Sequence, residues 1–284
     1  MVDGSEERLT GGTFSSVHRR GQEVLRRAQP WSATTIGLLS HLQRAGFSAA
    51  PRPVGDGFAA DGRERLAFID AEPQADRPWS DEGVFELGRL HRELHDAAAT
   101  YRPVCPSWSS GWPRGLPQRD TDLVIGHGDP GPWNVLGRDG RPVALIDWDS
   151  AGPVGRRWAV AEAAWLNAHL YDDDVAERHG LPSPGARARQ VGLFADGYGL
   201  EGRERARLAA DMVEVALRSA AHEATVSGVT PDGPTRFPEP GASWPFTGDV
   251  LTWTLAWRVR SARWMLDHEA LLSAALSRPV ARGG

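Results

Sequence analysis

The chain has 284 residues, of which 40% are hydrophobic and 24% are charged. This composition is typical of a globular protein that can bury a sizeable core, arranged as one large domain or as two lobes. The net charge of −5 argues against general nucleic-acid binding, which needs a basic surface. All 32 basic residues are arginines, so no lysine is available for a catalytic or phosphate-binding role.

Cysteine content and the N-terminus bear on the cellular location. The single cysteine, Cys105, excludes an internal disulfide and a cysteine-based metal cluster, as is typical of a reducing compartment. The N-terminus "MVDGSEERLTGG" is polar and acidic, unlike a secretory signal. No apolar run approaches the roughly 18 residues of a membrane-spanning helix. We therefore expect a soluble, cytoplasmic protein with neither a membrane nor a nucleic-acid partner.

The first seventy residues predict a small sheet with one helix. The sequence "LTGGTFSSVHRRGQEVLRR" (9–27) indicates a hairpin, with a Gly-Gly turn before its first strand and a Gly-Gln turn before its second. "SATTIGLLSHLQRAGF" (32–47) has apolar residues at helical spacing, with Ser32 as the expected N-cap. "RERLAFID" (63–70) follows the turn "DGR" and predicts another strand.

After these residues the pattern changes from strands to helices. "AEPQADRPWS" is a polar connector, and "SDEGVFELGRLHRELHDAA" predicts an amphipathic helix capped by Ser80. Beyond Ala159 the chain is mostly helical and ends in one helix over about 249–276, after a long Pro- and Gly-rich loop. We therefore expect an α+β fold with a small antiparallel β-sheet lobe over 1–69 and a larger, mainly helical lobe over 70–284.

The densest group of reactive side chains lies in "VIGHGDPGPWNVLGRDGRPVALIDWDSAGP". One apolar run ends at His127 and Asp129, a second ends at Asp147, and Asn134 stands five residues beyond Asp129. Carboxylate and amide oxygens are ligands that Mg²⁺ takes beside nucleotide phosphates, and a further carboxylate can accept a hydroxyl proton. Asp and Asn also favour plain turns. The joint spacing H-x-D-x-x-x-x-N, followed by an Asp at a strand end, is far more specific.

"HGDPGPWNVL" followed by "IDWDSAGP" resembles the aminoglycoside phosphotransferase and choline kinase family. The helix "LGRLHRELHD", the glycine hairpin and "RAGFSAAPRPVG" lie where such enzymes have counterparts, so the resemblance covers most of the chain. Within the family, "GPWNV" resembles bacterial proteins related to the trifolitoxin immunity protein. The resemblance implies a bilobal protein-kinase-like fold, with an N-terminal nucleotide-binding lobe and a C-terminal catalytic and substrate-binding lobe.

The resemblance also implies roles for single residues. Asp129 would be the catalytic base that receives the acceptor hydroxyl. Asn134 and Asp147 would hold Mg²⁺, and His127 would tie the catalytic loop to the metal-binding segment. Asp149 would support the site locally or reach the metal through water.

The same resemblance implies a site for ATP or GTP as co-substrate. The residues implied are Gly11, Gly12 and Ser15 in the glycine turn, Arg26 on the following strand, Phe68 and Ile69 before the connector, and Leu136 and Ile146 as apolar supports near the adenine.

Three positions depart from the family pattern. Such enzymes commonly carry a phosphate-gripping Lys on the third strand and a partner Glu on the following helix. Here the strand reads "EVLRR", and its period-two alternation turns Arg26, rather than Arg27, toward the phosphates. Thr35 stands in place of the helix Glu, and Ala159 in place of an Asp that braces the catalytic loop. These changes indicate either a coupled replacement or weakened nucleotide binding.

The function that follows is a Mg²⁺-dependent transfer of the γ-phosphate of ATP or GTP to a hydroxyl of a small molecule. The candidate acceptor-binding residues are Trp133, Glu162, Asp172 and Asp196, the acidic ones being suited to a cationic substrate. Two alternatives stay open. One is a kinase for Ser or Thr of a peptide, in natural-product tailoring or toxin immunity. The other is a kinase-shaped binding or immunity protein without turnover.

Overall fold

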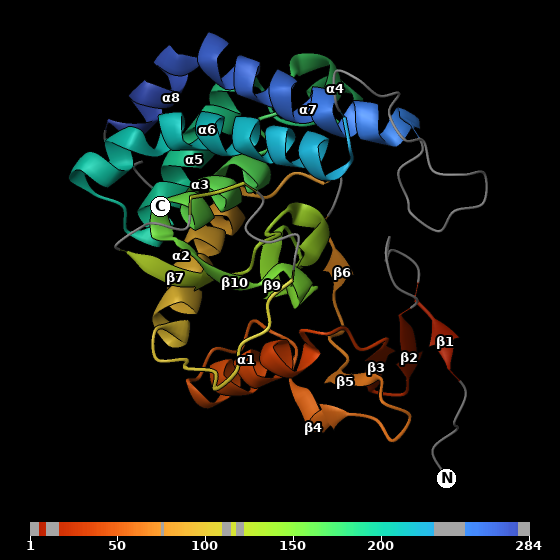
Figure 1. Ribbon diagram of the computed structural model, residues 1–284. Helices are drawn as coiled ribbons and strands as arrows, with labels where there is room; N and C mark the ends of the chain where they lie inside the picture. Colours follow the sequence, from red (N-terminus) through yellow and green to blue (C-terminus); the bar gives the residue numbers. More distant parts are fainter. Residues whose placement is uncertain are drawn as a thin grey trace.

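The computed structural model describes residues 6–9, 17–74, 77–109, 115–117, 122–229 and 248–277. Figure 1 shows an N-terminal antiparallel sheet with one helix, followed by a larger region that is mainly helical. The predicted α+β fold is therefore confirmed, while the lobe boundary between residues 69 and 70 stays a prediction.

Five strands form the N-terminal sheet, in the order β1-β2-β3-β5-β4 with antiparallel neighbours. The strands are β1 (Glu7–Arg8), β2 (His18–Arg20), β3 (Glu23–Arg26), β4 (Pro53–Phe58) and β5 (Glu64–Ala67). The predicted turn between β2 and β3 is present, and its Gly21 has a φ of 61° that favours glycine. The pairing of β3 with β5 sets Arg26 directly opposite Glu64. The expected turn at Gly11 and Gly12 lies outside the described residues.

Helix α1 (Ser32–Arg44) packs beside this sheet and buries the apolar positions that its sequence spacing indicated. Its N-cap is Trp31 rather than the predicted Ser32. The Ser32 hydroxyl has other partners, because it accepts a bond from the Gln29 N–H (2.7 Å) and donates to the carboxylate of Glu64. A side chain that satisfies a strand carboxylate is not available to cap its own helix.

The polar connector contains a strand that joins the two parts of the molecule. Strand β6 (Glu72–Pro73) pairs with β8 (Val135–Arg138), which pairs in turn with β9 (Arg141–Leu145). The pairing places Pro73 opposite Leu136, and the Gln74 N–H donates to the carbonyl of Val135 (3.0 Å). The connector is thereby fixed to the hairpin that follows the predicted catalytic loop.

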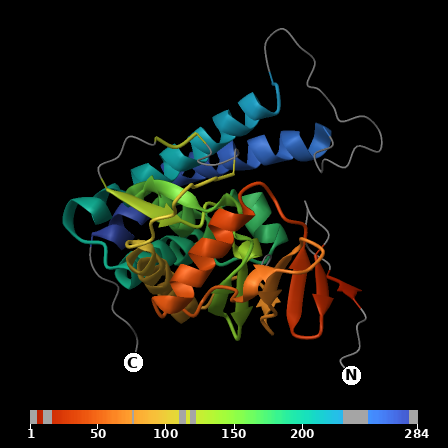
Figure 2. The ribbon, with the colours of Figure 1, turned by 60° about the horizontal axis from the view of Figure 1, so that its bottom comes forward.

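The remaining elements make up the helical part (Figure 1). They are α2 (Asp81–Ala98), β7 (Leu123–Gly126), β10 (Gly152–Gly155), α3 (Arg156–Asn167), α4 (Asp173–Arg178), α5 (Pro184–Tyr198), α6 (Gly202–Val226), α7 (Gly248–Asp267) and α8 (Glu269–Leu276). Ser80 caps α2 as predicted, since its Oγ accepts from the Gly83 N–H at 3.0 Å. The prediction of a single C-terminal helix over 249–276 is wrong, because the helix is interrupted at His268 and forms α7 and α8. Figure 2 shows α6 and α7 lying side by side.

Helices α2 and α5 form the closest helix contact in the core. A Cβ on Gly88 of α2 would lie 2.1 Å from the Phe194 carbonyl oxygen, and a Cβ on Gly197 of α5 would lie 2.0 Å from the Phe85 carbonyl oxygen. The two backbones therefore touch, and only glycine fits at both points. None of the helices in the described ranges is long and apolar enough to cross a membrane.

Candidate active site

The two segments of the predicted motif converge on each other. Strand β7 pairs antiparallel with β10, with Gly126 opposite Gly152, so the chain after β7 and the chain before β10 lie at the same end of the pair. Gly128 has a φ of 79°, and a Cβ there would lie 1.8 Å from the Ser150 carbonyl oxygen. The loop after β7 is therefore in backbone contact with the turn after β9. This contact explains why the motif needs a glycine between its His and its Asp.

His127 holds the two segments together. Its Nε2 donates to the carbonyl of Ile146 (2.9 Å), and the ring meets the ring of Trp148 edge to face at a centroid distance of 4.7 Å. Trp148 is itself buried and donates from its indole to the carbonyl of Leu145 (2.9 Å). These contacts are those of a structural residue, the role that was predicted for His127.

Asn134 links the loop to the segment that carries Asp147. The side-chain Nδ2 of Asn134 donates to the carbonyl of Asp129 (3.0 Å), and its backbone carbonyl accepts from the Ile146 N–H (2.8 Å). Asp147, the next residue, adopts a left-handed conformation with a φ of 61°. Such a conformation is strained for a non-glycine residue and is typical of functional sites.

The chemistry of this pair fits a hard divalent cation. Because the amide nitrogen of Asn134 is bonded to the loop, its oxygen would be the ligating atom, and the half-exposed carboxylate of Asp147 would supply a second oxygen. Within the described ranges, no cluster of three or more His, Cys, Asp or Glu side chains is arranged as a metal site. An ion held by Asn134 and Asp147 would therefore take further ligands from phosphate and water, as Mg²⁺ does with nucleotides.

The carboxylates of this region influence one another electrostatically. Desolvation raises the pKa of Asp147 above its ordinary value. Arg26 opposes this rise, while the charges of Asp149 and Asp129 add to it. The three acidic groups are thus close enough for the charge of one to disfavour ionisation of another, a condition that a bound cation relieves.

Arg26 is the cationic centre of the site. Its guanidinium bonds to Asp147 Oδ1 from Nη1 (3.2 Å), to Asp149 Oδ1 from Nη2 (2.9 Å), and to Glu64 from Nε. We call these four residues the Arg26 cluster. Burial acts to lower the pKa of Arg26, but the charges of Asp149, Glu64 and Asp147 outweigh it and raise the pKa, so the group stays protonated. Arg27, the first residue beyond β3, is exposed.

Glu64 is a functional residue that the sequence interpretation missed. The helix carboxylate expected near Thr35 is replaced by this strand carboxylate, which is fully buried beneath Arg26 and also accepts the Ser32 hydroxyl. The one available signal was an acidic residue at an inward-facing position of the strand "RERLAFID". Without the register of β3 against β5, nothing in the sequence connects it to Arg26.

Asn167 takes over the bracing of the catalytic loop. Its Nδ2 donates to the carbonyl of Pro130 (2.7 Å), and its Oδ1 accepts from the indole of Trp79 (3.2 Å). Asn167 is fully buried at the end of α3, two turns beyond Ala159, where the family pattern indicated an Asp. The loop is therefore braced from the same helix but by a neutral amide.

Asp129 and Trp133 are joined within the loop. The indole Nε1 of Trp133 donates to Asp129 Oδ1 (3.2 Å), which fixes the orientation of that carboxylate. Trp133 is 38% exposed, and the body of its ring lines a cavity together with residues of α4 and α7.

The predicted nucleotide-site residues fall into two groups. Phe68 and Ile69 lie between β5 and β6, with the guanidinium of Arg19 stacked 3.7 Å from the centroid of the Phe68 ring. Leu136 is buried on β8, beside the connector, and Ile146 is half-buried next to Asp147. The structure thus places these four around the junction of the two parts. Gly11, Gly12 and Ser15 lie outside the described residues.

The acidic residues proposed for substrate binding have other partners. Asp172 caps α4 and is bonded to Arg260 Nε (2.8 Å), and Asp196 is bonded to Arg205 Nη1 (2.6 Å). Glu162 is buried inside α3. Of the four candidates for acceptor binding, only Trp133 lines the cavity beside the catalytic loop.

Comparisons with known proteins agree with this geometry. No family model matches the sequence. The trifolitoxin immunity protein of Rhizobium leguminosarum bv. trifolii is 45% identical over 270 residues, which cover 95% of this chain and 98% of that protein.

Solved structures show the fold. A choline/ethanolamine kinase family protein from Mesorhizobium loti superposes with a TM-score of 0.57 at 17% identity, covering 97% of this chain and 93% of the other. A microcompartment-associated aminopropanol kinase gives a TM-score of 0.58 at 16% identity, covering 96% and 94%. The chain therefore belongs to the trifolitoxin immunity protein family and has the protein-kinase-like fold of the choline kinases.

Proposed function

We propose that this protein is a Mg²⁺-dependent phosphotransferase that moves the γ-phosphate of ATP or GTP to a hydroxyl of a small molecule. The observation that carries the proposal is the convergence of Asp129, Asn134 and Asp147 beside the protonated guanidinium of Arg26. A bound Mg²⁺ would neutralise phosphate charge. The fold of the choline kinases supports the same class of reaction.

Asp129 acts on the acceptor in this scheme. Its carboxylate is held by the indole of Trp133 through one oxygen, and it can accept the proton of an incoming hydroxyl through its other oxygen. Most of the catalysis in phosphoryl transfer comes from positioning and charge neutralisation, so a carboxylate fixed in one orientation is the contribution expected of the protein.

Arg26 supplies the positive charge that a Lys supplies in related enzymes. Its planar guanidinium offers two N–H groups toward Asp147 and Asp149 while Nε is bonded to Glu64. When phosphates enter, these two N–H groups can bind phosphate oxygens in the bidentate manner that guanidinium favours, and Glu64 keeps the side chain in place.

Family membership favours a second candidate function. The chain belongs to the family of an immunity protein, whose role is protection against a toxin. Two other activities would also serve such protection: nucleotide binding without turnover, and phosphorylation of Ser or Thr in a peptide. The intact set of Asp129, Asn134 and Asp147 favours turnover.

The first experiment tests nucleotide binding and transfer together. The purified protein is titrated with ATP and with GTP, with and without Mg²⁺, and then assayed for phosphate transfer to aminoglycosides, choline-like amines, sugars and peptides. We expect Mg²⁺-dependent binding, and we expect Asp129→Asn to reduce transfer by about 10³-fold or more while nucleotide affinity stays within threefold.

Asp139→Asn is the matched control, because Asp139 lies in the exposed β8–β9 turn at a φ of 52°, which Asn tolerates. Failure of both nucleotides to bind would refute the kinase proposal. Binding with no transfer to any acceptor would favour the binding protein.

A second experiment tests the phosphate-binding role of Arg26. Arg26→Ala should weaken ATP or GTP binding by about tenfold, whereas Arg27→Ala, which removes the exposed guanidinium of the next residue, should change it less than twofold. Isothermal titration at constant ionic strength measures both. The reverse order would show that the wrong face of β3 had been assigned to the nucleotide.

A further inference from the structure

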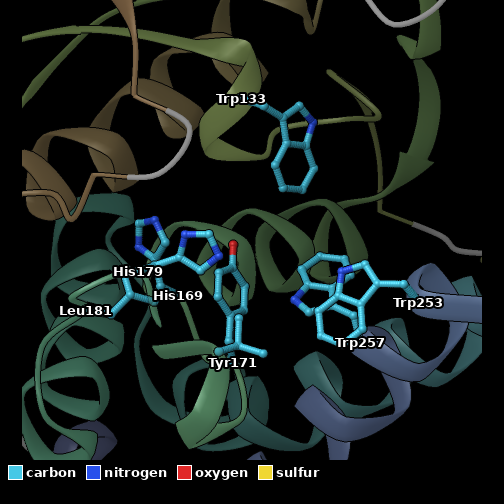
Figure 3. Close-up of a pocket in the computed structure, with 8 residues that line it drawn as sticks. Trp133, His169, Tyr171, His179, Leu181, Trp253 and Trp257 are labelled. Atoms are coloured by element: carbon cyan, nitrogen blue, oxygen red, sulfur yellow. The ribbon is translucent and has the colours of Figure 1, made fainter. Parts of the chain in front are cut away.

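An aromatic cavity lies directly beside the proposed catalytic base. It has a volume of about 230 Å³ and is lined by Trp133, His169, Tyr171, Val175, His179, Leu181, Trp253 and Trp257. Figure 3 shows the ring of Trp133 pointing into this space toward Tyr171 and Trp257. Since the other edge of Trp133 is bonded to Asp129, the cavity and the carboxylate share one side chain.

The aromatic walls are held in place by one another. Trp257 stacks on the buried Trp165 at a centroid distance of 5.4 Å, while Tyr171 and Trp133 meet Trp257 at steep angles, at 5.3 and 6.2 Å. Edge-to-face and stacked arrangements of this kind are those that aromatic rings favour, so the walls of the cavity are held in a defined arrangement.

The volume limits the size of the occupant. A cavity of about 150 Å³ holds one benzene ring, so 230 Å³ suits a single ring with a short substituent. Drug-sized ligands occupy roughly 300 Å³ or more, and a multi-ring aminosugar would not be enclosed.

The described residues that line the cavity offer no carboxylate to a cation, and the neighbouring carboxylate of Asp129 is already bonded to the indole of Trp133. The nearest acidic run is engaged in ion pairs, with Asp172 and Asp174 bonded to Arg260 and Asp173 bonded to Arg187. The faces of Trp257 and Trp253 also have arginines above them, with Arg258 and Arg260 at 5.7 and 5.9 Å. The cation–π attraction that these rings would offer to an ammonium ligand is therefore partly used within the protein.

The buried histidine of the lining is neutral. Desolvation lowers the pKa of His169 to about 4, so its imidazole carries no charge near pH 7. Trp133, Tyr171 and Trp257 leave the cavity predominantly apolar.

We propose that this cavity selects an uncharged acceptor in which the reacting hydroxyl stands next to a single aromatic ring. The ring would occupy the cavity that Trp133, Tyr171 and Trp257 line, and the hydroxyl would be directed toward Asp129. The assignment of the hydroxyl as phosphate acceptor rests on the proposed function, whereas ring binding does not.

The experiment measures binding without nucleotide, by ligand-observed NMR titration of the full chain. The probes are 2-phenylethanol as a free alcohol and N-acetyl-Ser-Phe-amide as a peptide, with choline and kanamycin as cationic comparators. We expect saturable binding of at least one aromatic probe and at least tenfold weaker binding of both cations. Binding of the free alcohol alone or of the peptide alone identifies the source of the acceptor, and either result supports the proposal.

Two variants locate the binding. Trp257→Ala should lower the affinity for the aromatic probe at least tenfold. Trp108→Ala, which removes a half-buried tryptophan outside the lining, should change this affinity less than twofold. His179→Glu places a carboxylate at an exposed position of the wall, and it should strengthen choline binding at least threefold.

The results separate this inference from the proposed function. Tight choline or kanamycin binding to the unaltered protein, unchanged affinity in Trp257→Ala, no response of choline binding to His179→Glu, or no aromatic binding would overturn the inference. Nucleotide binding and transfer to another acceptor would then still stand. Ring binding without any phosphate transfer would leave the inference in place and refute the kinase activity.

Discussion

The α2–α5 interface and the Arg26 cluster hold the molecule together in opposite ways. At the α2–α5 interface, Gly88 and Gly197 let two helix backbones touch, and the buried side chains Leu87 and Phe194 beside them are apolar. In the Arg26 cluster, one guanidinium meets three carboxylates drawn from β5 and from the turn after β9. The first contact depends on shape and the second on charge.

This difference indicates which part of the protein can exchange its contacts when a ligand binds. In a close-packed interface the atoms have no free space into which they can move, so any increase in side-chain volume strains the structure. The Arg26 cluster brings two of its carboxylates to partly exposed positions, with Asp147 half exposed and Asp149 30% exposed. A nucleotide and its metal can compete for these charges without disturbing the helical part.

The largest effect is expected from adding one methyl group at the α2–α5 interface. In Gly88→Ala the new Cβ would meet the Phe194 carbonyl oxygen at 2.1 Å and the Tyr198 nitrogen at 2.8 Å, both of them backbone atoms. We expect a loss of about 3 kcal/mol in the free energy of unfolding, measured by urea denaturation.

Gly185→Ala is the matched control. Gly185 lies in the first turn of α5 with nothing within 4 Å of an added Cβ, so the change should stay within about 0.5 kcal/mol. Equal stability of the two variants would mean that the helices do not pack through their backbones.

A smaller effect is expected from removing one charge of the Arg26 cluster. Glu64→Gln keeps the shape of the side chain but removes its negative charge and leaves one acceptor oxygen where Arg26 and Ser32 now each donate to a separate one. We expect a loss of about 2 kcal/mol in the free energy of unfolding, since Asp147 and Asp149 still face the guanidinium.

The control for this variant is Glu72→Gln, whose ion pair with Arg77 is largely exposed and should contribute within about 0.5 kcal/mol. A Glu64→Gln protein as stable as the control would show that the buried carboxylate does not hold Arg26.

The smallest effect is the pH dependence that His91 contributes at the α2–α5 interface. Burial, with a minor contribution from the charge of His127, lowers the pKa of His91 to about 3. The folded protein therefore keeps this imidazole neutral, while the unfolded chain takes up a proton below its ordinary pKa of about 6.5. Stability is thus full above that pH and is lost as the pH falls toward 3.

Between pH 7 and pH 6, His91 should account for roughly 0.7 kcal/mol of lost stability. His91→Gln, which cannot titrate, should show a pH dependence smaller by that amount in urea denaturation at the two pH values. A variant and a parent with the same pH dependence would contradict the burial of a neutral imidazole at this position.

Local patterns predicted much of this structure, and long-range pairing accounts for the rest. Ser80 was identified as a cap because its partner is three residues away. Ser32 was misassigned because its hydroxyl serves Glu64, 32 residues further along the chain. The catalytic motif was readable because Asp129 and Asn134 lie five residues apart in one loop.

The supporting residues of the site could not be predicted from the sequence in the same way. Glu64 is opposite Arg26 only through the register of β3 against β5, and Asn167 reaches Pro130 across 37 positions. Pairings between residues so far apart in the chain produce no periodic pattern in the sequence. The aromatic cavity was anticipated only at Trp133, because its other walls come from α7 and from the segment around α4, at residues 36 or more positions away.

The brace at Asn167 also restricts how this site can change over generations. Its amide gives an N–H to the carbonyl of Pro130 and takes one from Trp79, and a carboxylate can do only the second. A lineage that acquired an acid at position 167 would set a negative charge against a carbonyl oxygen inside the core. An acidic residue at position 167 would therefore require the loop peptide to flip at the same time, which restricts the substitutions that this position can accept.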